Sequence, residues 1–396
     1  MLENKTVVLG VTGSIAAYKI ANLASALKKL RCDVHVIMTK NATNFINPIT
    51  FETLTGNKCL VDTFDRNFEF NVEHVSLAQK ADVFMVAPAS ANVIGKIAGG
   101  IADDMLTTTI MAAKCPKLIS PAMNTGMYEN PIVQDNLEKL KKYGYEIIDP
   151  ADGYLACGDT GKGKMPEPEF LLECIKKTVA KDKIFKGKNI LITAGPTMEK
   201  IDPVRFISNR STGKMGYALA KIAMYEGANV TLVTGKTHIK KPEFINVIEV
   251  ESAQEMYESV AENFDNQDVV IMSAAVADYR PKNVASEKMK KKDGEMAIEL
   301  DRTTDILATL SQKKSKQFLC GFSMETENML ENSKEKLKKK SLDMICANNL
   351  KVEGAGFGVD TNVVTIITPN DIKELPIMSK EDVAEKILEE INNRLT

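Results

Sequence analysis

Short apolar runs alternate along the chain with stretches in which apolar residues recur every three or four positions. Four runs in the first half predict β-strands: residues 6–11, 33–38, 82–87 and 117–120. Between the first two, the spacing of Ile20, Leu23 and Leu27 gives one apolar helix face. This alternation predicts a parallel sheet with helical crossovers, and ligands bind such sheets beyond the carboxyl ends of the strands.

The same pattern starts again near residue 188. Three further apolar runs predict strands: residues 189–193, 229–234 and 268–273. A helix over residues 214–226 is expected to end at Gly227, a suitable C-terminal cap. A strand at 363–368 and a last helix at 380–393 complete this half. The two beginnings, KTVVLGVTGSIAAYK and KNILITAGPTMEKID, predict two nucleotide-sized sites on one chain.

The length of the chain agrees with two domains. Its 396 residues exceed the roughly 100–200 expected of a single domain. Pro166 and Pro168 precede a helix at 169–180, which is followed by the charged stretch KDKIFKGK, and we place the boundary near Asp182. We therefore expect two doubly wound, Rossmann-like α/β domains with mainly parallel sheets, at residues 1–181 and 182–396.

Charge and composition exclude several classes of protein. The net charge is −2 and Lys and Glu are interspersed, which argues against a nucleic-acid surface. The sequence contains no apolar run of the ~18 residues needed for a membrane span and no export signal. Seven cysteines are scattered without a CxxC pair or a disulfide-dense pattern, as in reduced proteins. We expect a cytoplasmic protein with neither a nucleic-acid nor a membrane partner.

The glycine-containing turn after the first strand fits a phosphate. It matches neither GxGxxG nor GxxxxGK followed by Ser or Thr. Gly10 and Gly13 allow the backbone to approach a ligand, Ser14 offers a hydroxyl, and the following helix directs amide hydrogens at an anion. A plain tight turn is the alternative interpretation.

Two further loops strengthen the interpretation as a binding site. PASAN follows the third strand and PAMN the fourth. With GSIAAYK, KIAGGIADDML and ADGYLACG, these strings resemble the flavin-containing cysteine decarboxylases, the family of phosphopantothenoylcysteine decarboxylase, over residues 5–168. The resemblance implies a flavodoxin-like domain that binds FMN. The FMN-binding residues that it implies are Gly13, Ser14, Thr39, Ser90, Asn92 and Met123.

The chemistry of this family explains the need for a flavin. Removing the carboxylate of a cysteine amide leaves a carbanion that nothing stabilises. The family's flavin oxidises the thiol-bearing carbon to a thioaldehyde, and loss of carbon dioxide then gives a delocalised enethiolate. The electrons finally return with a proton, so the reaction has no net redox change.

The resemblance also implies three catalytic residues in the first half. His74 would act as a base on the substrate or position it, which suits an imidazole. Asn124 would bind the departing carboxylate, and Cys157 would protonate the enethiolate from a flap flanked by Gly153 and Gly158. Taken singly, these residues could instead be a surface histidine, a turn-forming asparagine and an inert buried cysteine.

The second half resembles a different family. TAGPTMEKIDPVRFISNRSTGKMG, SAAVADYRP, EKMKKK, GFSMET and LKKKSLDMICAN occur in the order found in the phosphopantothenate–cysteine ligases, over residues 188–370. The resemblance implies that CTP activates 4'-phosphopantothenate as an acyl cytidylate, from which the amine of cysteine displaces CMP. Mg²⁺ is expected with the triphosphate, but the sequence identifies no ligands for it.

Carried over to this chain, the ligase family implies a set of anion-binding residues. Those expected to contact CTP are Asp278, Lys288, Thr304, Asp305, Ile306, Leu307, Phe322, Lys336 and Lys340. Lys288 and Asn209 are also expected to be catalytic, and Asn209 and Arg210 would hold phosphopantothenate or the acyl cytidylate. Lysine runs are more often solvated helix faces. The chain also departs from the family pattern, having Thr-Thr-Asp at 303–305 in place of Asn-Pro-Asp.

Two other functions would leave different traces in the sequence. A non-catalytic, regulatory flavoprotein would lack the histidine, asparagine or cysteine described above, and all three are present. A nicotinamide-dependent reductase is disfavoured by the missing GxGxxG and the missing Tyr-x-x-x-Lys pair. The resemblance further implies a homo-oligomer with trimeric decarboxylase contacts and dimeric ligase contacts.

Overall fold

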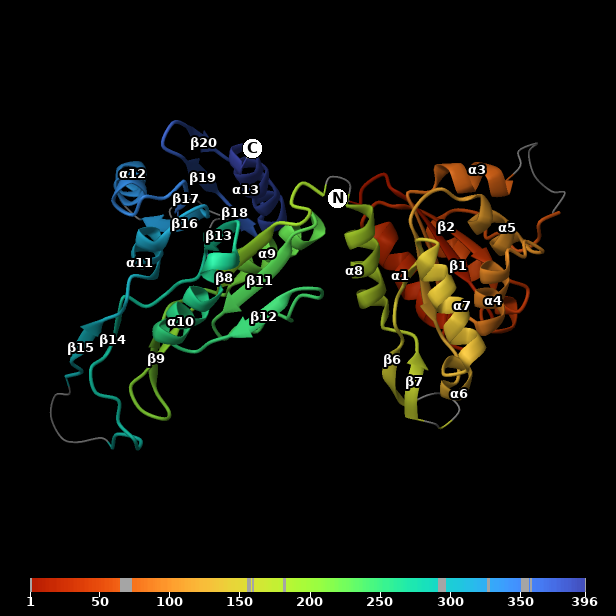
Figure 1. Cartoon of the computed structure of the whole chain (residues 1–396), viewed down its shortest axis with the longest axis horizontal. Helices are drawn as coiled ribbons and strands as arrows, with labels where there is room; N and C mark the ends of the chain where they lie inside the picture. Colours follow the sequence, from red (N-terminus) through yellow and green to blue (C-terminus); the bar gives the residue numbers. More distant parts are fainter. Residues whose placement is uncertain are drawn as a thin grey trace. The chain divides into compact units, whose positions relative to one another are not determined.

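The chain folds into two compact units, Met1–Ala180 and Lys181–Thr396 (Figure 1). The computed structural model describes residues 2–64, 73–154, 158, 160–180, 183–290, 297–325, 328–349, 356 and 358–395. Both units are α/β structures with mainly parallel sheets, which confirms the fold class expected from the sequence. In the part of the chain that is described, no helix combines the length and apolarity that crossing a bilayer requires.

The first unit is built on a parallel five-stranded sheet, counted over its described residues, with strand order β2-β1-β3-β4-β5. Its strands are β1 (Thr6–Val11), β2 (Asp33–Met38), β3 (Val83–Ala89), β4 (Lys117–Pro121) and β5 (Glu146–Ile147). This is the flavodoxin-like order, which reverses direction between β1 and β3. Ligands of such sheets bind at that reversal, beyond the carboxyl ends of the strands.

Helices cover both faces of this sheet. They are α1 (Ala17–Lys29), α2 (Pro48–Thr55), α3 (Glu73–Lys80), α4 (Ala91–Gly99), α5 (Met105–Ala112), α6 (Thr125–Tyr128), α7 (Pro131–Lys142) and α8 (Pro168–Val179), with the 3-10 turn η1 (Ala42–Asn44). Apolar side chains of α1, α2 and α8 form one core with the sheet, and those of α3, α4, α5 and α7 form a second. Leu23 and Leu27 are fully buried, as the periodicity of α1 predicted.

A two-stranded hairpin lies against the loop after β4. It consists of β6 (Ala151–Tyr154) and β7 (Thr160–Lys164). The amide of Met123 donates to the carbonyl of Gly163 at 3.1 Å. A β-carbon at Gly163 would lie 2.2 Å from the carbonyl oxygen of Met123, so only glycine allows this close approach.

The second unit contains an eight-stranded sheet, counted over its described residues. Its strands are β8 (Asn189–Ala194), β11 (Asn229–Thr234), β12 (Asn246–Glu249), β13 (Val269–Met272), β16 (Phe318–Glu325), β17 (Met344–Asn349), β19 (Val364–Ile367) and β20 (Ile372–Glu374). The parallel part runs β12-β11-β8-β13-β16-β17, which is the Rossmann order 3-2-1-4-5-6. Antiparallel β19 and β20 extend one edge, and the order reverses between β8 and β13.

The helices of the second unit are α9 (Lys214–Tyr225), α10 (Ala253–Asn263), α11 (Ile306–Lys313), α12 (Met329–Lys339) and α13 (Lys380–Leu395), with the 3-10 turn η2 (Phe264–Asn266). Helix α9 is the first helix after β8, and Gly216 brings it close to the sheet, because a β-carbon there would lie 2.6 Å from that of Ala194. Helix α13 packs against α9 through a buried face that includes Val383 and Ile387.

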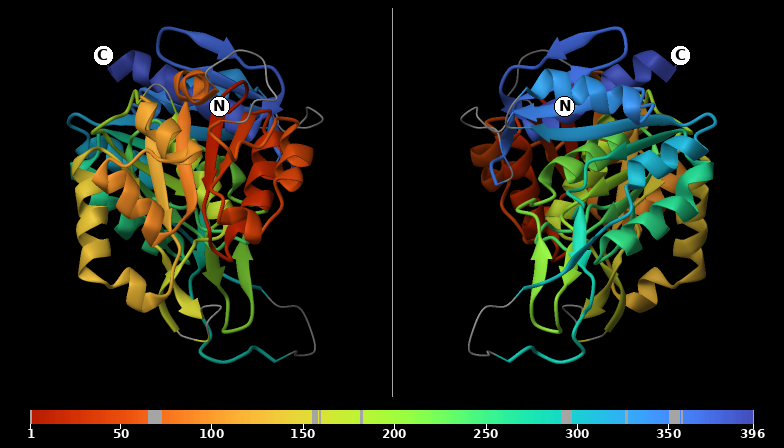
Figure 2. Two further views of the ribbon diagram at one scale, coloured as in Figure 1. Left: turned by 90° about the vertical axis from the view of Figure 1, so that its right-hand side faces the viewer. Right: turned by 90° about the vertical axis from the view of Figure 1, so that its left-hand side faces the viewer.

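Short strands form an arm that projects from the second sheet (Figures 1 and 2). It comprises the pair β14 (Tyr279–Pro281) and β15 (Leu300–Arg302), beside the pair β9 (Met198–Lys200) and β10 (Phe206–Ser208). A further pair, β18 (Thr361–Asn362) and β21 (Met378–Ser379), precedes α13. The carboxylate of Asp202 links the turn between β9 and β10 to the loop after β14, because it accepts hydrogen bonds from the amides of Val204, Arg205 and Met289 at 2.8, 2.8 and 3.2 Å.

Candidate active sites

The turn after β1 and the end of β3 are tied together at the reversal of the first sheet. Thr12 Oγ1 donates to the carbonyl of Pro88 at 2.7 Å and accepts from the amide of Ser90 at 2.9 Å. A β-carbon at Gly13 would lie 2.8 Å from that of Asn41, so the turn and the residues after β2 are in close contact. Thr39, at the end of β2, is buried and donates its amide to Val11 at 3.0 Å. Four of the residues expected to bind FMN, Gly13, Ser14, Thr39 and Ser90, thus come from the three strand ends that meet there.

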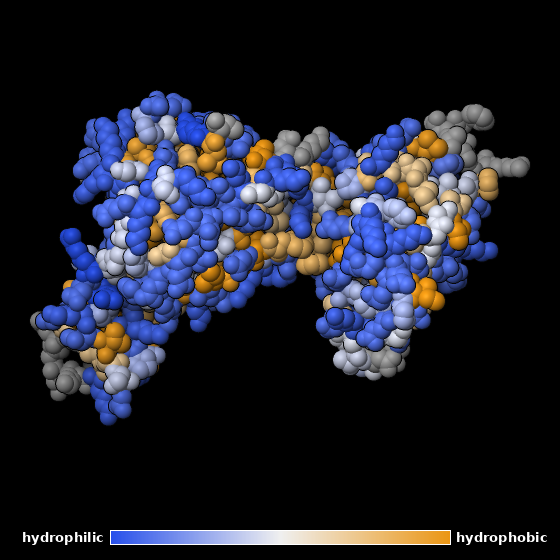
Figure 3. All heavy atoms as spheres, in the orientation of Figure 1, coloured by the Kyte–Doolittle hydropathy of each residue, from blue (hydrophilic) through white to orange (hydrophobic). Residues whose placement is uncertain are grey.

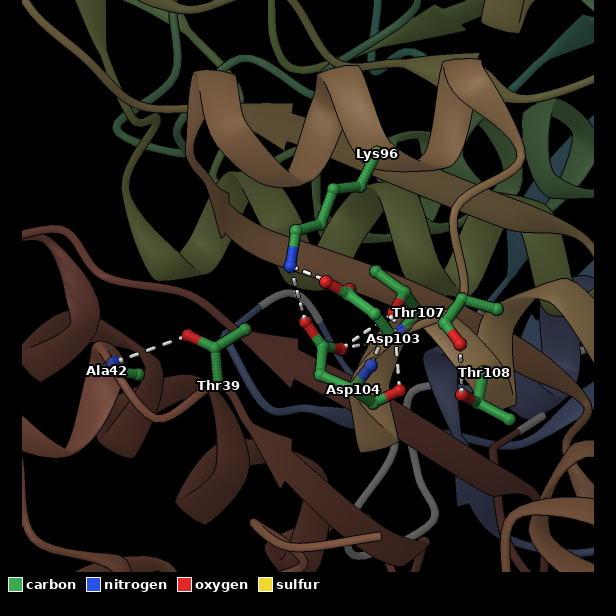
Figure 4. Close-up of polar contacts among 8 residues, drawn as sticks. Thr39, Ala42, Lys96, Asp103, Asp104, Thr107 and Thr108 are labelled. Atoms are coloured by element: carbon green, nitrogen blue, oxygen red, sulfur yellow. Dashed lines mark hydrogen bonds and ion pairs between the residues drawn. The ribbon is translucent and has the colours of Figure 1, made fainter.

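The tract KIAGGIADDML forms an ion-pair cluster between α4 and α5 (Figure 4). Lys96 reaches from α4 to Asp103 at 2.7 Å and to Asp104 at 3.4 Å. Asp104 also caps α5, accepting from the amide of Thr107 at 2.8 Å. The hydrogen bond with Asp103 raises the pKa of the Lys96 ammonium, so the cation stays charged and fixes the loop before α5.

A pocket of about 570 Å³ opens beside these strand ends in the first unit. Its described lining consists of Ser14, Ile15, Ala16, Tyr18, Lys19, Ala122, Met123, Asn124, Tyr154, Gly163, Lys164, Met165 and Glu167. Helix α1, the PAMN loop and the β6–β7 hairpin therefore enclose it. Among the expected site residues, Ser14, Met123 and Asn124 line the pocket.

Asn124 is held in place by the local backbone. It is the N-cap of α6, and its Oδ1 accepts from the amide of Gly126 at 2.8 Å. The neighbouring Met123 is fixed by its bond to the hairpin. The amide of Asn124 is thereby oriented at the pocket wall.

The other residues expected in the first site lie away from this wall. His74 is half-buried on α3 and Asn92 is exposed on α4, and neither belongs to the described lining of the pocket. Cys157 lies outside the described residues, so its expected role receives no structural account.

In the second unit, the loop before α9 meets the reversal of the sheet. The amide of Ala275 donates to the carbonyl of Gly195 at 2.9 Å, and Asn209 Nδ2 donates to the carbonyl of Ala275 at 3.0 Å. Arg210 is the next residue and is exposed. Asn209 and Arg210 thus lie beside the carboxyl ends of β8 and β13.

A pocket of about 130 Å³ begins at the same loop. Its described lining consists of Ser211, Thr212, Gly213, Lys214, Met215, Gly216, Ser273, Ala274, Ala275, Phe322, Ser323, Met324, Asn348, Gly356, Asn362 and Lys380. The N-terminus of α9 and the expected nucleotide residue Phe322 are therefore brought to one cavity. Such a helix terminus can receive a phosphate.

Two polar residues of this cavity were missed from the sequence. Asn348 is buried, and its Oδ1 finds no hydrogen-bond partner within the described structure. Lys380 is also buried, and its ammonium donates to the carbonyls of Gly356, at 3.0 Å, and Val359. Burial and the nearby Lys214 ammonium lower the pKa of Lys380. A polar ligand in this cavity can form a hydrogen bond with the unsatisfied amide oxygen of Asn348 and can interact with the buried ammonium of Lys380.

Several of the remaining residues expected to bind CTP gather at the N-terminus of α11. The carbonyl of Asp278 accepts from the amide of Thr303 at 3.0 Å, next to Thr304. Asp305 caps α11 through the amide of Ala308 at 3.0 Å and pairs with Lys340 at 2.8 Å. Burial of Asp305 opposes its ionisation, but the hydrogen bonds from Lys340 and from the amide of Ala308, together with the charges of Lys340 and Lys339, outweigh this effect and lower the pKa of the carboxyl.

The other residues of this group differ in how close they lie to this helix terminus. Ile306 is buried in the core, and Leu307 packs against Gly321, next to Phe322. Lys336 lies one turn before Lys340 along α12. Lys288 is separate from them, since it is exposed beside Met289 in the loop after β14 and lines neither pocket in the described structure.

Within the ranges that the structure describes, no group of three His, Cys, Asp or Glu side chains is arranged to hold a metal ion. Six described cysteines are free thiols: Cys32, Cys59, Cys115, Cys174, Cys320 and Cys346.

Comparison with known proteins divides the chain at the same place as the fold. A family described as flavoprotein matches residues 1–180, and a family described as the DNA/pantothenate metabolism flavoprotein C-terminal domain matches residues 185–395. These matches agree with the two resemblances found in the sequence.

Relatives match the chain over its whole length. A coenzyme A biosynthesis bifunctional protein of Bacillus subtilis is 49% identical and covers 99% of this chain and 97% of its own. The protein of the same name from Borreliella burgdorferi is 43% identical over 98% and 99%. A crystal structure of the C-terminal domain of such a protein is 46% identical, with a TM-score of 0.47, and covers 54% of this chain and 98% of its own. The chain therefore belongs to the family of bifunctional coenzyme A biosynthesis proteins, enzymes that combine a phosphopantothenoylcysteine decarboxylase with a phosphopantothenate–cysteine ligase.

Proposed function

We propose that residues 1–181 carry the decarboxylase activity of this bifunctional enzyme and residues 182–396 the ligase activity. One observation supports the division most directly. Each unit places its own family motifs at the reversal of its own sheet, GSI with PASAN in the first and SNRSTGKMG with SAA in the second. The ligase half makes phosphopantothenoylcysteine from 4'-phosphopantothenate, cysteine and CTP, and the decarboxylase half converts it to 4'-phosphopantetheine.

FMN is the proposed cofactor of the first unit. The reversal between β1 and β3 is where flavodoxin-like sheets bind FMN, and Gly13 lets the turn after β1 pack closely on Asn41, after β2, at that reversal. Gly13, Ser14, Thr39 and Ser90 would hold it there, with Met123 at the pocket and Asn92 nearby on α4. When bound, FMN supplies a reversible acceptor for an electron pair, which this decarboxylation requires.

The protein's own groups then handle the substrate and its protons. Asn124 binds the carboxylate that departs, with an amide already fixed at the pocket wall. Cys157 delivers the final proton to carbon, and His74 acts as the base or positions the substrate.

The ligase half recognises three anionic or zwitterionic substrates. Asn209 and Arg210 hold phosphopantothenate, and the N-terminus of α9 receives phosphate oxygens. CTP binds to a set of residues that consists of Asp278, residues 304–307, Phe322, Lys336 and Lys340. Mg²⁺ would enter with the triphosphate, because the described residues provide no carboxylate cluster of their own.

The position of Lys288 favours a homo-oligomer. It lies on the arm, whose exposed apolar side chains include Tyr279, Val284 and Leu300, and Figure 3 shows apolar patches on this part of the surface. Exposed apolar groups on a projecting arm are typical of a subunit interface. We propose that ligase units pair through this arm, which would carry Lys288 toward a partner's nucleotide, and that decarboxylase units form trimers.

Reconstitution tests the function as a whole. The purified protein should release FMN on acid treatment and, with 4'-phosphopantothenate, cysteine, CTP and Mg²⁺, should form 4'-phosphopantetheine, CMP, pyrophosphate and carbon dioxide. A protein that binds flavin but consumes no CTP and releases no carbon dioxide would instead support a regulatory flavoprotein.

A further inference from the structure

Two lysines line the same pocket as Asn124 in the first unit. Lys19 Nζ donates to Glu167 Oε1 at 2.7 Å, and Lys164 Nζ lies 3.8 Å from the same oxygen. These three are the charged side chains in the described lining of the pocket. Two ammonium groups thus share one carboxylate, which leaves an excess of positive charge.

Lys19 is fixed more firmly than Glu167, its ion-pair partner. The side chain of Lys19 is 13% exposed, whereas that of Glu167 is 58% exposed. The hydrogen bond from Lys19 lowers the pKa of Glu167, so the carboxylate is ionised at neutral pH. An exposed carboxylate can turn into solvent, and a more highly charged anion can then take its place beside Lys19.

The rest of the pocket suits an uncharged chain. Apart from the three charged side chains, its described lining is uncharged and mostly apolar or aromatic, and it includes Ile15, Tyr18, Ala122, Met123, Tyr154 and Met165. Phosphopantothenoylcysteine carries a carboxylate at one end, a phosphate at the other and an uncharged pantothenoyl chain between them. The pocket offers a matching group for each part.

We propose that Lys19, assisted by Lys164, binds the phosphate of phosphopantothenoylcysteine while Asn124 binds its carboxylate. This inference rests on the proposed decarboxylase function and adds the residues that select a phosphorylated substrate. A phosphate monoester carries a charge of about −1.5 to −2 at pH 7, so it competes well with the single charge of Glu167. The two lysines therefore set specificity at a distance from the reacting carbon.

A flavin phosphate is the other phosphate monoester that could reach this unit. Of the residues expected to bind FMN, Ser14 and Met123 belong to the described lining of the pocket, whereas Thr39 and Ser90 do not. The lysines share this lining with Tyr154 and with Asn124, which binds the substrate carboxylate. This grouping favours the substrate phosphate, and the flavin content of the variants separates the two phosphates.

The test compares Lys19→Gln with the wild type on two substrates. For phosphopantothenoylcysteine we expect kcat/KM to fall about tenfold to hundredfold, the usual effect of losing a hydrogen bond to a charged group, mainly through KM. For pantothenoylcysteine, which lacks the phosphate, we expect little change. Lys19→Arg should keep most of the preference for the phosphorylated substrate, because it retains the charge.

Two controls distinguish binding of the substrate phosphate from a general effect of charge and from binding of the flavin phosphate. Lys162→Gln removes an exposed lysine of β7 that does not line the pocket, and it should leave both substrates unaffected. Flavin content, measured by absorbance, should be the same in all variants. An equal loss for both substrates, or a loss of bound flavin in Lys19→Gln, would overturn the proposal. A wild-type enzyme that decarboxylates neither substrate would refute the decarboxylase function itself, and the proposal with it.

Discussion

Within the arm, a single buried carboxylate connects the turn between β9 and β10 to the loop after β14. Asp202 accepts hydrogen bonds from the amides of Val204, Arg205 and Met289 and pairs with the guanidinium of Arg205 at 2.5 Å. Its side chain is inaccessible to solvent. The hydrogen bond from Arg205 is the main reason that the pKa of this carboxyl is lowered. The charged form of Asp202 therefore belongs to the folded state.

This pairing predicts a pH dependence of stability. A carboxyl with a lowered pKa in the folded state stabilises above the unfolded pKa, about 3.9, and loses that contribution as the pH falls further. We expect the melting temperature of the wild type to drop more steeply below about pH 4 than that of Asp202→Asn. Asp135→Asn, at an exposed position of α7, is the control. Parallel melting curves for the wild type and Asp202→Asn across this range would contradict the assignment.

Candidate site residues that belong to a short, recognisable motif could be found from the sequence. Asn124 and Asn209 follow recognisable strings, and the structure places both at strand ends. Lys19, Lys380 and Asn348 could not be found in this way. Lys19 is part of GSIAAYK, but the direction of a lysine on a helix depends on packing, and Lys380 reaches its cavity from the last helix of the chain.

At the scale of elements, two glycines inside helices predict opposite responses to the same substitution. A β-carbon at Gly216 of α9 would lie 2.6 Å from that of Ala194 and 2.9 Å from the carbonyl of Thr193. At Gly95 of α4 the nearest such neighbour is Asn136 Nδ2 at 3.8 Å. We expect Gly216→Ala to cost about 1–3 kcal/mol and Gly95→Ala to stabilise by about 0.5–1 kcal/mol.

Calorimetry of both variants measures this contrast, since each unit can melt separately. The Gly216→Ala transition should move to lower temperature and the Gly95→Ala transition to higher temperature. Equal stability of Gly216→Ala and the wild type would show that α9 does not pack closely on β8.

The regular elements were largely predictable from the sequence because their apolar periodicity is strong. The strand predicted at 229–234 and the helix predicted at 214–226 correspond to β11, Asn229–Thr234, and α9, Lys214–Tyr225. The arm and the antiparallel edge strand β20 were not predicted. Their strands are short and exposed, so they carry little of the alternation that marks a buried strand.

For the whole molecule, the arm predicts how ligase units associate. Leu300→Glu and Val284→Glu place charges on exposed apolar positions of the arm without disturbing a core. We expect this double variant to form smaller assemblies in analytical ultracentrifugation and to lose ligation, while it keeps its bound flavin. Ile377→Glu, at an exposed position away from the arm, should do neither. An unchanged assembly size in the arm variant would refute pairing through the arm.

The central claim is that one chain holds two separate sites and that the second unit supplies the substrate of the first. Asn124→Asp tests it in the full-length protein, because aspartate retains the N-cap of α6 but repels a carboxylate. With 4'-phosphopantothenate, cysteine and CTP, the variant should release CMP at the wild-type rate and accumulate phosphopantothenoylcysteine, with little carbon dioxide formed. A parallel loss of CMP release would show that the two activities share a site, and it would contradict this account.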